Sequence, residues 1–247
     1  MKRKYSFSLF LLFLLSATTS TAQVFLESTP VGTVQDGGLV VYGRTGNNNR
    51  IPYDKISGSP FWQNGYLPAM LFDKSNQSLG KAPVKLNLYT NEVYFQTPQG
   101  EERVAAAGKV RKIIFYKNTD FKDVVAVFEN GLSLIPEVNP RAEDPSYVQV
   151  LNNGDAQLLK HIRIQFVTAD SLFGTMKRYY FSDQVHYYMN TKFGQVVRLK
   201  KLTKDLVVEY LNIDRDAEAW IREQGLNFKK EEEVVRFLDY WNGRKKS

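Results

Sequence analysis

The chain has 247 residues, contains no cysteine and carries a formal net charge of +7. The absence of cysteine excludes thiol catalysis, cysteine-ligated zinc and iron–sulfur clusters. Six positive charges stand at residues 2–4 and 244–246, so the body of the chain is nearly neutral. It therefore lacks the basic face that nucleic-acid binding needs, and we expect no nucleic-acid partner.

The first 22 residues have the three parts of a secretory signal peptide. Residues 2–4 are basic, an apolar run follows, and Ser20 and Ala22 provide the small side chains that signal peptidase requires before a cut at Gln23. A membrane anchor is the alternative, but the apolar run is shorter than the ~20 residues that cross a bilayer. We therefore predict export to the periplasm or the cell exterior, and no transmembrane segment in the mature chain.

From about residue 39 to residue 200 the chain has the pattern of antiparallel strands. Apolar residues alternate with polar ones at residues 84–88, before a turn at Asn91. Asn130-Gly131 and Ser182-Asp183 provide further turn signals. One apolar and one polar face indicate strands that pack on one side only. We predict a mainly β fold for residues 23–200, an antiparallel meander that forms a curved sheet or a partly open barrel.

After Leu202 the apolar period changes to that of a helix. Thr203 and Asp214 stand where two helices need N-caps, and Gly225 stands where the second helix ends. A third helix is predicted from about residue 229 to residue 241. Residues 201–247 are too few for a large core of their own. We predict a short C-terminal helical segment that packs on an edge or open end of the β domain.

Catalytic and metal-binding patterns are sparse in the sequence. His161 and His186 are the two histidines, and no paired-ligand spacing such as HExxH occurs. No P-loop or dinucleotide-binding motif is present. Histidines that stand alone in strands are far more often surface or packing residues than ligands. We therefore expect no catalytic residue, no metal and no cofactor.

One aromatic cluster has the character of a binding site. Phe61, Trp62 and Tyr66 lie in a segment rich in turn residues, where a large contribution to the core is less expected. Aromatic rings on loops can stack on sugars or on partner side chains. The alternative is that Trp62 folds back into the core, as large aromatic residues often do. Phe61, Trp62 and Tyr66 are the candidate ligand-binding residues.

Several short motifs resemble a recurrent pattern in exported Bacteroidetes-type proteins. They are ISGSPF at residues 56–61, KLNLY and VYF at 85–89 and 93–95, VLNNG and LLK at 150–154 and 158–160, and FKKEE and YWN at 228–232 and 240–242. The resemblance spans most of the mature chain. It implies a periplasmic or secreted setting and assigns no activity. Asp170-Ser171-Leu172 also resembles the short O-glycosylation acceptor of such bacteria.

Three functions remain open on the sequence alone. The leading hypothesis is a non-catalytic exported binding or structural protein that recognises a protein or ligand of the cell envelope. The second is a carrier that holds an apolar ligand inside the curved sheet. The third is a carbohydrate-active enzyme that uses a carboxylate pair, for which Glu92, Glu101, Glu102 and Glu129 are candidates.

Overall fold

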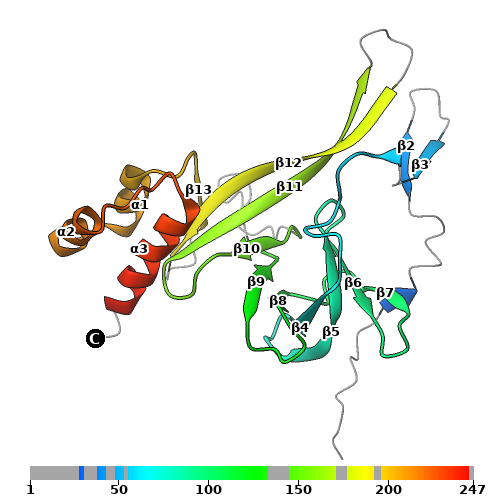
Figure 1. The fold of residues 1–247 in the computed structure, drawn as a ribbon, viewed down its shortest axis with the longest axis horizontal. Coiled ribbons are helices and arrows are strands. Elements are labelled where there is room, and N and C mark those ends of the chain that lie inside the picture. The colour runs from blue at the N-terminus through cyan, green and yellow to red at the C-terminus, as the bar shows by residue number, and fades with distance from the viewer. Residues whose placement is uncertain are drawn as a thin grey trace, which may run out of the picture.

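The computed structural model describes residues 28–30, 38–42, 48–52, 55–132, 145–170, 177–191 and 196–244. These residues form one long sheet, one two-stranded sheet and three helices (Figure 1). The predicted signal peptide, with its cut before Gln23, and Ser171 and Leu172 of the predicted glycosylation motif lie outside them. Within the described residues, no helix is long and apolar enough to span a membrane.

The long sheet is antiparallel throughout and open. Its strands are β1 (Ser28–Pro30), β4 (Leu67–Phe72), β5 (Ser78–Asn87), β6 (Glu92–Gln96), β7 (Glu102–Ala105), β8 (Lys112–Tyr116), β9 (Val124–Glu129), β10 (Val148–Val150), β11 (Gln157–Asp170), β12 (Lys177–Asn190) and β13 (Val196–Leu199). Their order is β1-β7-β6-β5-β4-β8-β9-β10-β11-β12-β13. Within the described residues the two edge strands, β1 and β13, do not pair with each other. The predicted mainly β, antiparallel and unclosed fold is confirmed. Strands β2 (Gly38–Tyr42) and β3 (Asn48–Pro52) form the small sheet.

The chain makes two meanders that meet at β4 and β8. Strands β4 to β7 follow one another across the sheet, and β8 then returns to pair with β4. The predicted turn between β5 and β6 is present, with Asn91 in the left-handed conformation at φ 57°. The predicted turn at Ser182-Asp183 is wrong, because both residues lie inside β12. This strand pairs with β11 over its whole length, and that continuous ladder outweighs the local turn preference.

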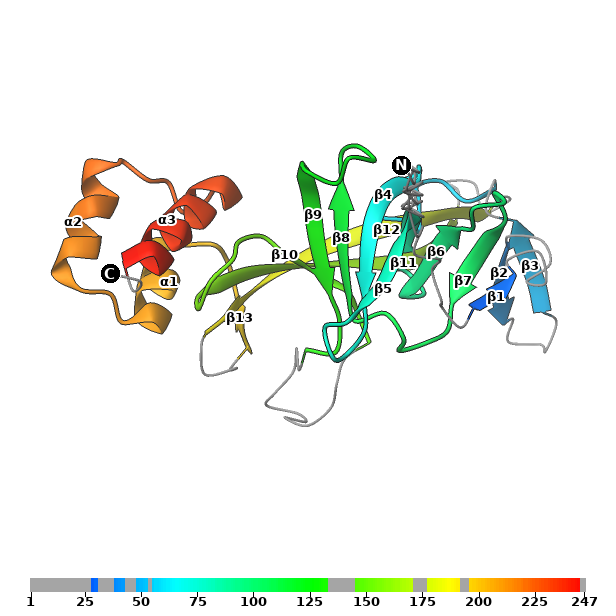
Figure 2. The same cartoon turned by 90° about the horizontal axis from the view of Figure 1, so that it is seen from below.

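The main core lies on the concave side of strands β4, β5, β6, β8 and β9. It contains buried side chains from each of these strands, among them Leu71, Val84, Leu86, Phe95, Ile113, Phe115 and Phe128. Ile162 and Ile164 of β11 and Trp62 pack against it. Figures 1 and 2 show the long β11–β12 hairpin running across the molecule, from the helices at one end to the small sheet at the other.

Three helices cover the base of this hairpin. They are α1 (Lys204–Leu211), α2 (Arg215–Glu223) and α3 (Glu231–Arg244). Their apolar faces form a second core with Leu158, Met189 and Leu199 of strands β11 to β13. The hydrophobic contact between these helices and the sheet provides most of the stability of such short helices.

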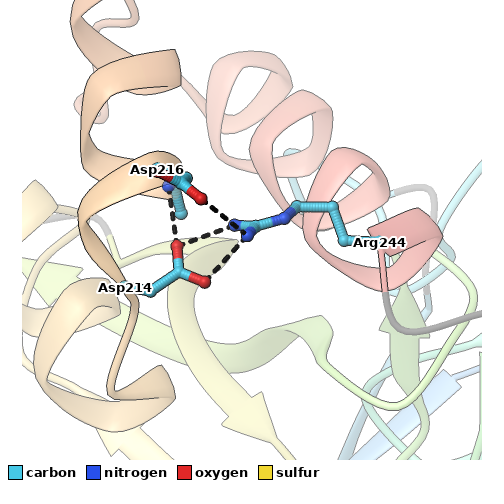
Figure 3. Close-up of polar contacts among 4 residues, drawn as sticks. Asp214, Asp216 and Arg244 are labelled. Atoms are coloured by element: carbon cyan, nitrogen blue, oxygen red, sulfur yellow. Dashed lines mark hydrogen bonds and ion pairs between the residues drawn. The ribbon is translucent and has the colours of Figure 1, made fainter. Parts of the chain in front are cut away.

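A charged pair joins the ends of α2 and α3. Asp214 caps α2 by accepting a hydrogen bond from Ala217 N at 2.8 Å. Its two carboxylate oxygens also accept from Arg244 at 2.8 Å each, and the guanidinium lies 3.9 Å from Asp216 (Figure 3). The hydrogen bonds from Arg244, and then from Ala217 N, hold the pKa of Asp214 below its usual value. The predicted cap at Asp214 is therefore also the contact that ties α2 to α3.

A buried asparagine fixes α3 to the turn between β10 and β11. Asn242 Oδ1 accepts from Ala156 N at 2.9 Å, and Nδ2 donates to the carbonyl oxygens of Asn153 and Ala156 at 2.9 and 2.8 Å. Gly154, at φ 122°, leaves room for this side chain, because a Cβ there would lie 2.4 Å from Cγ of Asn242. The contact gives the buried Ala156 N–H its acceptor and adds a second donor to the two carbonyl oxygens, which also accept from Asn152 Nδ2 at 3.3 and 2.8 Å.

We expect Asn242→Ala to lower the free energy of unfolding by roughly 1–3 kcal/mol, because it leaves the buried Ala156 N–H without its acceptor. Urea unfolding followed by circular dichroism measures the change. Asn153→Ala is the matched control: it makes the same substitution in the same turn, but the Asn153 side chain is exposed, and we expect less than about 0.5 kcal/mol. Equal losses in the two variants would contradict the role of Asn242.

Candidate functional site

The three candidate aromatic residues lie in one segment, residues 55–66, which we call the crossing segment. At one end it pairs with β12, where Ser57 N donates to Tyr179 O at 3.0 Å and Ser57 O accepts from Phe181 N at 2.8 Å. At its other end Trp62 N donates to Leu86 O at 3.0 Å, on β5. The crossing segment therefore connects the long hairpin with the curved part of the sheet.

Gly58 makes the first of these contacts sterically possible. Its φ is 84°, in the region that only glycine adopts readily. A Cβ at this position would lie 2.9 Å from Phe181 O, which is a backbone atom of β12 and cannot move aside cheaply. Gly58 of the ISGSPF motif therefore allows the crossing segment to approach the backbone of β12 closely.

Trp62 points into the molecule. Its ring centroid lies 4.9 Å from that of Phe115 and 5.0 Å from that of Phe128, on β8 and β9. Part of its side chain remains accessible and lines a groove. Trp62 thus contributes to the core and to a surface site at the same time.

Phe61 and Tyr66 lie on the opposite, outer face of the sheet. Both contact Lys85 of β5, whose Nζ is 4.4 Å from the ring centroid of Phe61 and 4.9 Å from that of Tyr66. Phe61 also packs edge-to-face on Tyr94 of β6, with centroids 5.5 Å apart. The structure therefore brings Phe61 and Tyr66 together and turns Trp62 away. Lys85 and Tyr94 were not among the predicted site residues, although strand alternation puts both on polar strand faces.

Next to the close approach at Gly58, the crossing segment and the hairpin enclose a groove of about 340 Å³. It is lined by Gly58, Ser59, Phe61, Trp62, Leu88, Ile162, Ile164, Phe181, Ser182 and Asp183. Most of these side chains are apolar. Ser59, Ser182 and Asp183 add hydroxyl and carboxylate groups, so the groove combines apolar walls with a few hydrogen-bonding groups.

The four candidate carboxylates each have a partner on the protein. Glu92 accepts from Thr90 and Tyr94 hydroxyls at 2.7 and 3.2 Å, Glu101 pairs with Arg103 at 3.1 Å, Glu102 with Lys85 at 3.5 Å, and Glu129 with Lys112 at 3.2 Å. Burial raises the pKa of Glu102. These contacts give each of the four carboxylates a structural role, either at the surface or between neighbouring strands.

The two histidines face each other across the hairpin. His161 and His186 are register partners with ring centroids 6.5 Å apart. Arg198 Nη2 lies 3.0 Å from His186 Nδ1. A guanidinium can only donate, so Nδ1 is the acceptor and the imidazole is neutral in this contact. Among the described residues, no group of three or more His, Asp or Glu side chains is placed to hold a metal ion.

Comparison with known proteins gives no match. No family model, no curated protein and no solved structure matches this chain. The resemblance to exported Bacteroidetes-type proteins rests on short motifs and stays a sequence-based expectation. The function therefore has to be argued from the groove and the surfaces around it.

We expect Gly58→Ala to destabilise the protein by roughly 1–3 kcal/mol, because alanine is strained at this φ and its Cβ would collide with the β12 backbone. Gly65→Ala is the matched control in the same segment, since a Cβ there meets nothing within 4 Å. We expect it to be neutral or slightly stabilising, by up to about 1 kcal/mol. Thermal and urea unfolding of both variants test this, and a Gly65 variant that is as unstable as the Gly58 variant would contradict it.

We expect stability to fall with pH below about 6.5, the unperturbed histidine pKa. Burial, followed by the charges of Arg198 and Arg163, lowers the pKa of His186 in the folded protein. The unfolded chain then binds the proton more readily, so the contribution of His186 is present above about pH 6.5 and is lost as pH falls through the lower folded-state pKa. Urea unfolding between about pH 5 and pH 8 should give a flatter curve for His186→Gln than for the native protein. Identical curves would contradict this assignment.

Proposed function

We propose that this protein is an exported, non-catalytic binding protein and that the groove between the crossing segment and the β11–β12 hairpin holds its ligand. The observation that carries this proposal is the composition of the groove. Its walls come from three parts of the chain: the crossing segment, Leu88 directly after β5, and strands β11 and β12 of the hairpin. Its volume of about 340 Å³ falls at the small end of the range for ligand pockets.

The lining defines a chemical class of ligand. Trp62, Ile162, Ile164 and Phe181 favour an apolar or ring-shaped body, because burial of apolar surface is the main source of affinity. The carboxylate of Asp183 favours a hydroxyl or N–H group on the ligand, since an ionised carboxylate can only accept hydrogen bonds. We infer a small, mainly apolar molecule with at least one hydrogen-bond donor.

The groove supports this proposal better than either alternative. A carrier with its ligand inside the curved sheet has little support, because Phe115, Phe128 and their neighbours fill the concave side and Trp62 packs on them. A carbohydrate-active enzyme needs a carboxylate pair that is available for acid–base work. Glu92, Glu101, Glu102 and Glu129 instead have contacts with the protein's own side chains.

Export is the sequence-based part of the proposal. It rests on the basic, apolar and small-residue parts of residues 1–22, with a cut before Gln23. Mass spectrometry of the protein from its native envelope tests it, because an exported chain should begin at Gln23. In the native form the same measurement also detects a bound ligand as extra mass that is lost on denaturation.

We expect the mature protein to bind N-phenyl-1-naphthylamine, a neutral apolar probe with one N–H donor, in a saturable manner. Ser182→Phe fills the groove and should weaken binding at least about tenfold, which corresponds to about 1.4 kcal/mol. Thr168→Phe is the matched control, because Thr168 is an exposed residue of the same hairpin that does not line the groove. Probe fluorescence measures the affinities.

Equal affinity in the two variants would contradict the groove as the binding site. Turnover of a substrate in an activity screen, abolished by a single carboxylate substitution, would contradict a non-catalytic function.

A further inference from the structure

A second cluster lies on the outer face of the sheet, behind the groove. Lys85 and Asn87 are two residues apart on β5, so their side chains share one face. The register pairs Lys85 with Tyr94 and Asn87 with Glu92 on β6, which places all four on that face. The crossing segment lays Phe61 and Tyr66 over them.

The side chains around Lys85 form a cage for a cation. Lys85 Nζ lies 4.4, 4.9 and 5.6 Å from the ring centroids of Phe61, Tyr66 and Tyr94. The Glu102 carboxylate is 3.5 Å away on β7. All three rings are within the ~6 Å at which an aromatic face attracts a cation. Several rings and a carboxylate around one ammonium group are the means by which proteins recognise organic cations.

We propose that Phe61, Tyr66, Tyr94 and Glu102 form a binding site for an alkylammonium group, and that Lys85 is its tethered occupant. A ligand ammonium group, primary or quaternary, binds when the Lys85 side chain swings out on its flexible stem. This proposal is independent of the groove ligand, although Phe61 contributes to both sites.

One further observation supports a ligand on this face. The Tyr66 hydroxyl is buried and has no hydrogen-bond partner within the described part of the chain. A buried polar atom of this kind is rare and calls for an explanation such as an additional bound group. The hydroxyl oxygen can accept a hydrogen bond from a primary ammonium group, which can only donate.

The site remains open to solvent. The side chains of Lys85 and Glu102 retain 15% and 34% of their exposure, so the ammonium and its carboxylate partner lie near the surface. A free cation therefore reaches the cage by displacing one flexible side chain, with no change in the strands. Because the tethered lysine acts as a competitor at millimolar effective concentration, the native protein should bind free ammonium ions weakly.

Lys85→Ala empties the cage and should convert it into a site for free n-propylammonium, which replaces the atoms that the substitution removes. We expect saturable chemical-shift changes of the Tyr66 and Tyr94 ring protons and an increase in thermal stability, with an affinity at least about tenfold higher than that of the native protein. The neutral 1-propanol should produce neither effect. Lys85→Met, which keeps most of the stem, provides a second variant if the alanine variant does not fold.

Lys81→Ala is the matched control. Lys81 is on the same strand and its Nζ lies 4.2 Å from the ring centroid of Phe121, but no other ring contact of Lys81 is found within the described residues. Its removal should create no ammonium site.

Tetramethylammonium is tested beside n-propylammonium to identify the kind of ligand. Tighter binding of tetramethylammonium indicates a choline-type ligand, and tighter binding of n-propylammonium indicates a lysine side chain of a partner. Binding of either ion supports the proposal.

The absence of saturable binding of both ions to Lys85→Ala and Lys85→Met would overturn the proposal, and so would equal affinity in the native protein and these variants. These outcomes are separable from those for the groove. Ser182→Phe should leave ammonium binding to the Lys85 variants intact, and Lys85→Ala should leave binding of the naphthylamine probe intact.

Discussion

The apolar concave face of the curved sheet must be shielded from water, and this requirement organises the rest of the molecule. No second sheet is packed on this face within the described residues. Trp62 from the crossing segment and Ile162 and Ile164 from the hairpin provide the cover instead. Because this cover comes from a single segment and a single hairpin, gaps remain at its margin, and the groove is one of them. The proposed binding site is thus a consequence of how the core is closed.

The local features of the fold were predictable from the sequence, whereas the long-range ones were not. Alternation at residues 84–88 and the turn at Asn91 depend on neighbouring residues alone, and both were predicted correctly. The turn predicted at Ser182-Asp183 was wrong, because pairing with β11 keeps both residues in an extended strand. The return of β8 to β4 depends on contacts between distant residues, which no short pattern encodes.

The candidate site shows the same division. Phe61, Trp62 and Tyr66 stood out because large aromatic residues are unusual in a turn-rich segment. The structure places Phe61 and Tyr66 on one face and Trp62 on the other, a difference that depends on where the crossing segment meets β5. Lys85 and Tyr94 could have been placed on one face from strand alternation and the turn at Asn91. The contact of these two residues with the crossing segment could not have been predicted, because the position of that segment also depends on its pairing with β12.

The pairing of Ser57 with Tyr180 also constrains the order in which the protein folds. The crossing segment precedes the hairpin by a large part of the chain, so its Ser57 end cannot dock until β12 has been made, although its Trp62 end pairs with β5. Until the hairpin is in place, Ile162 and Ile164 do not cover the main core, and partly folded chains expose apolar surface. Contacts between such distant residues make folding slow. Closure of the main core is therefore a late step, which cannot be completed before β11 and β12 are present.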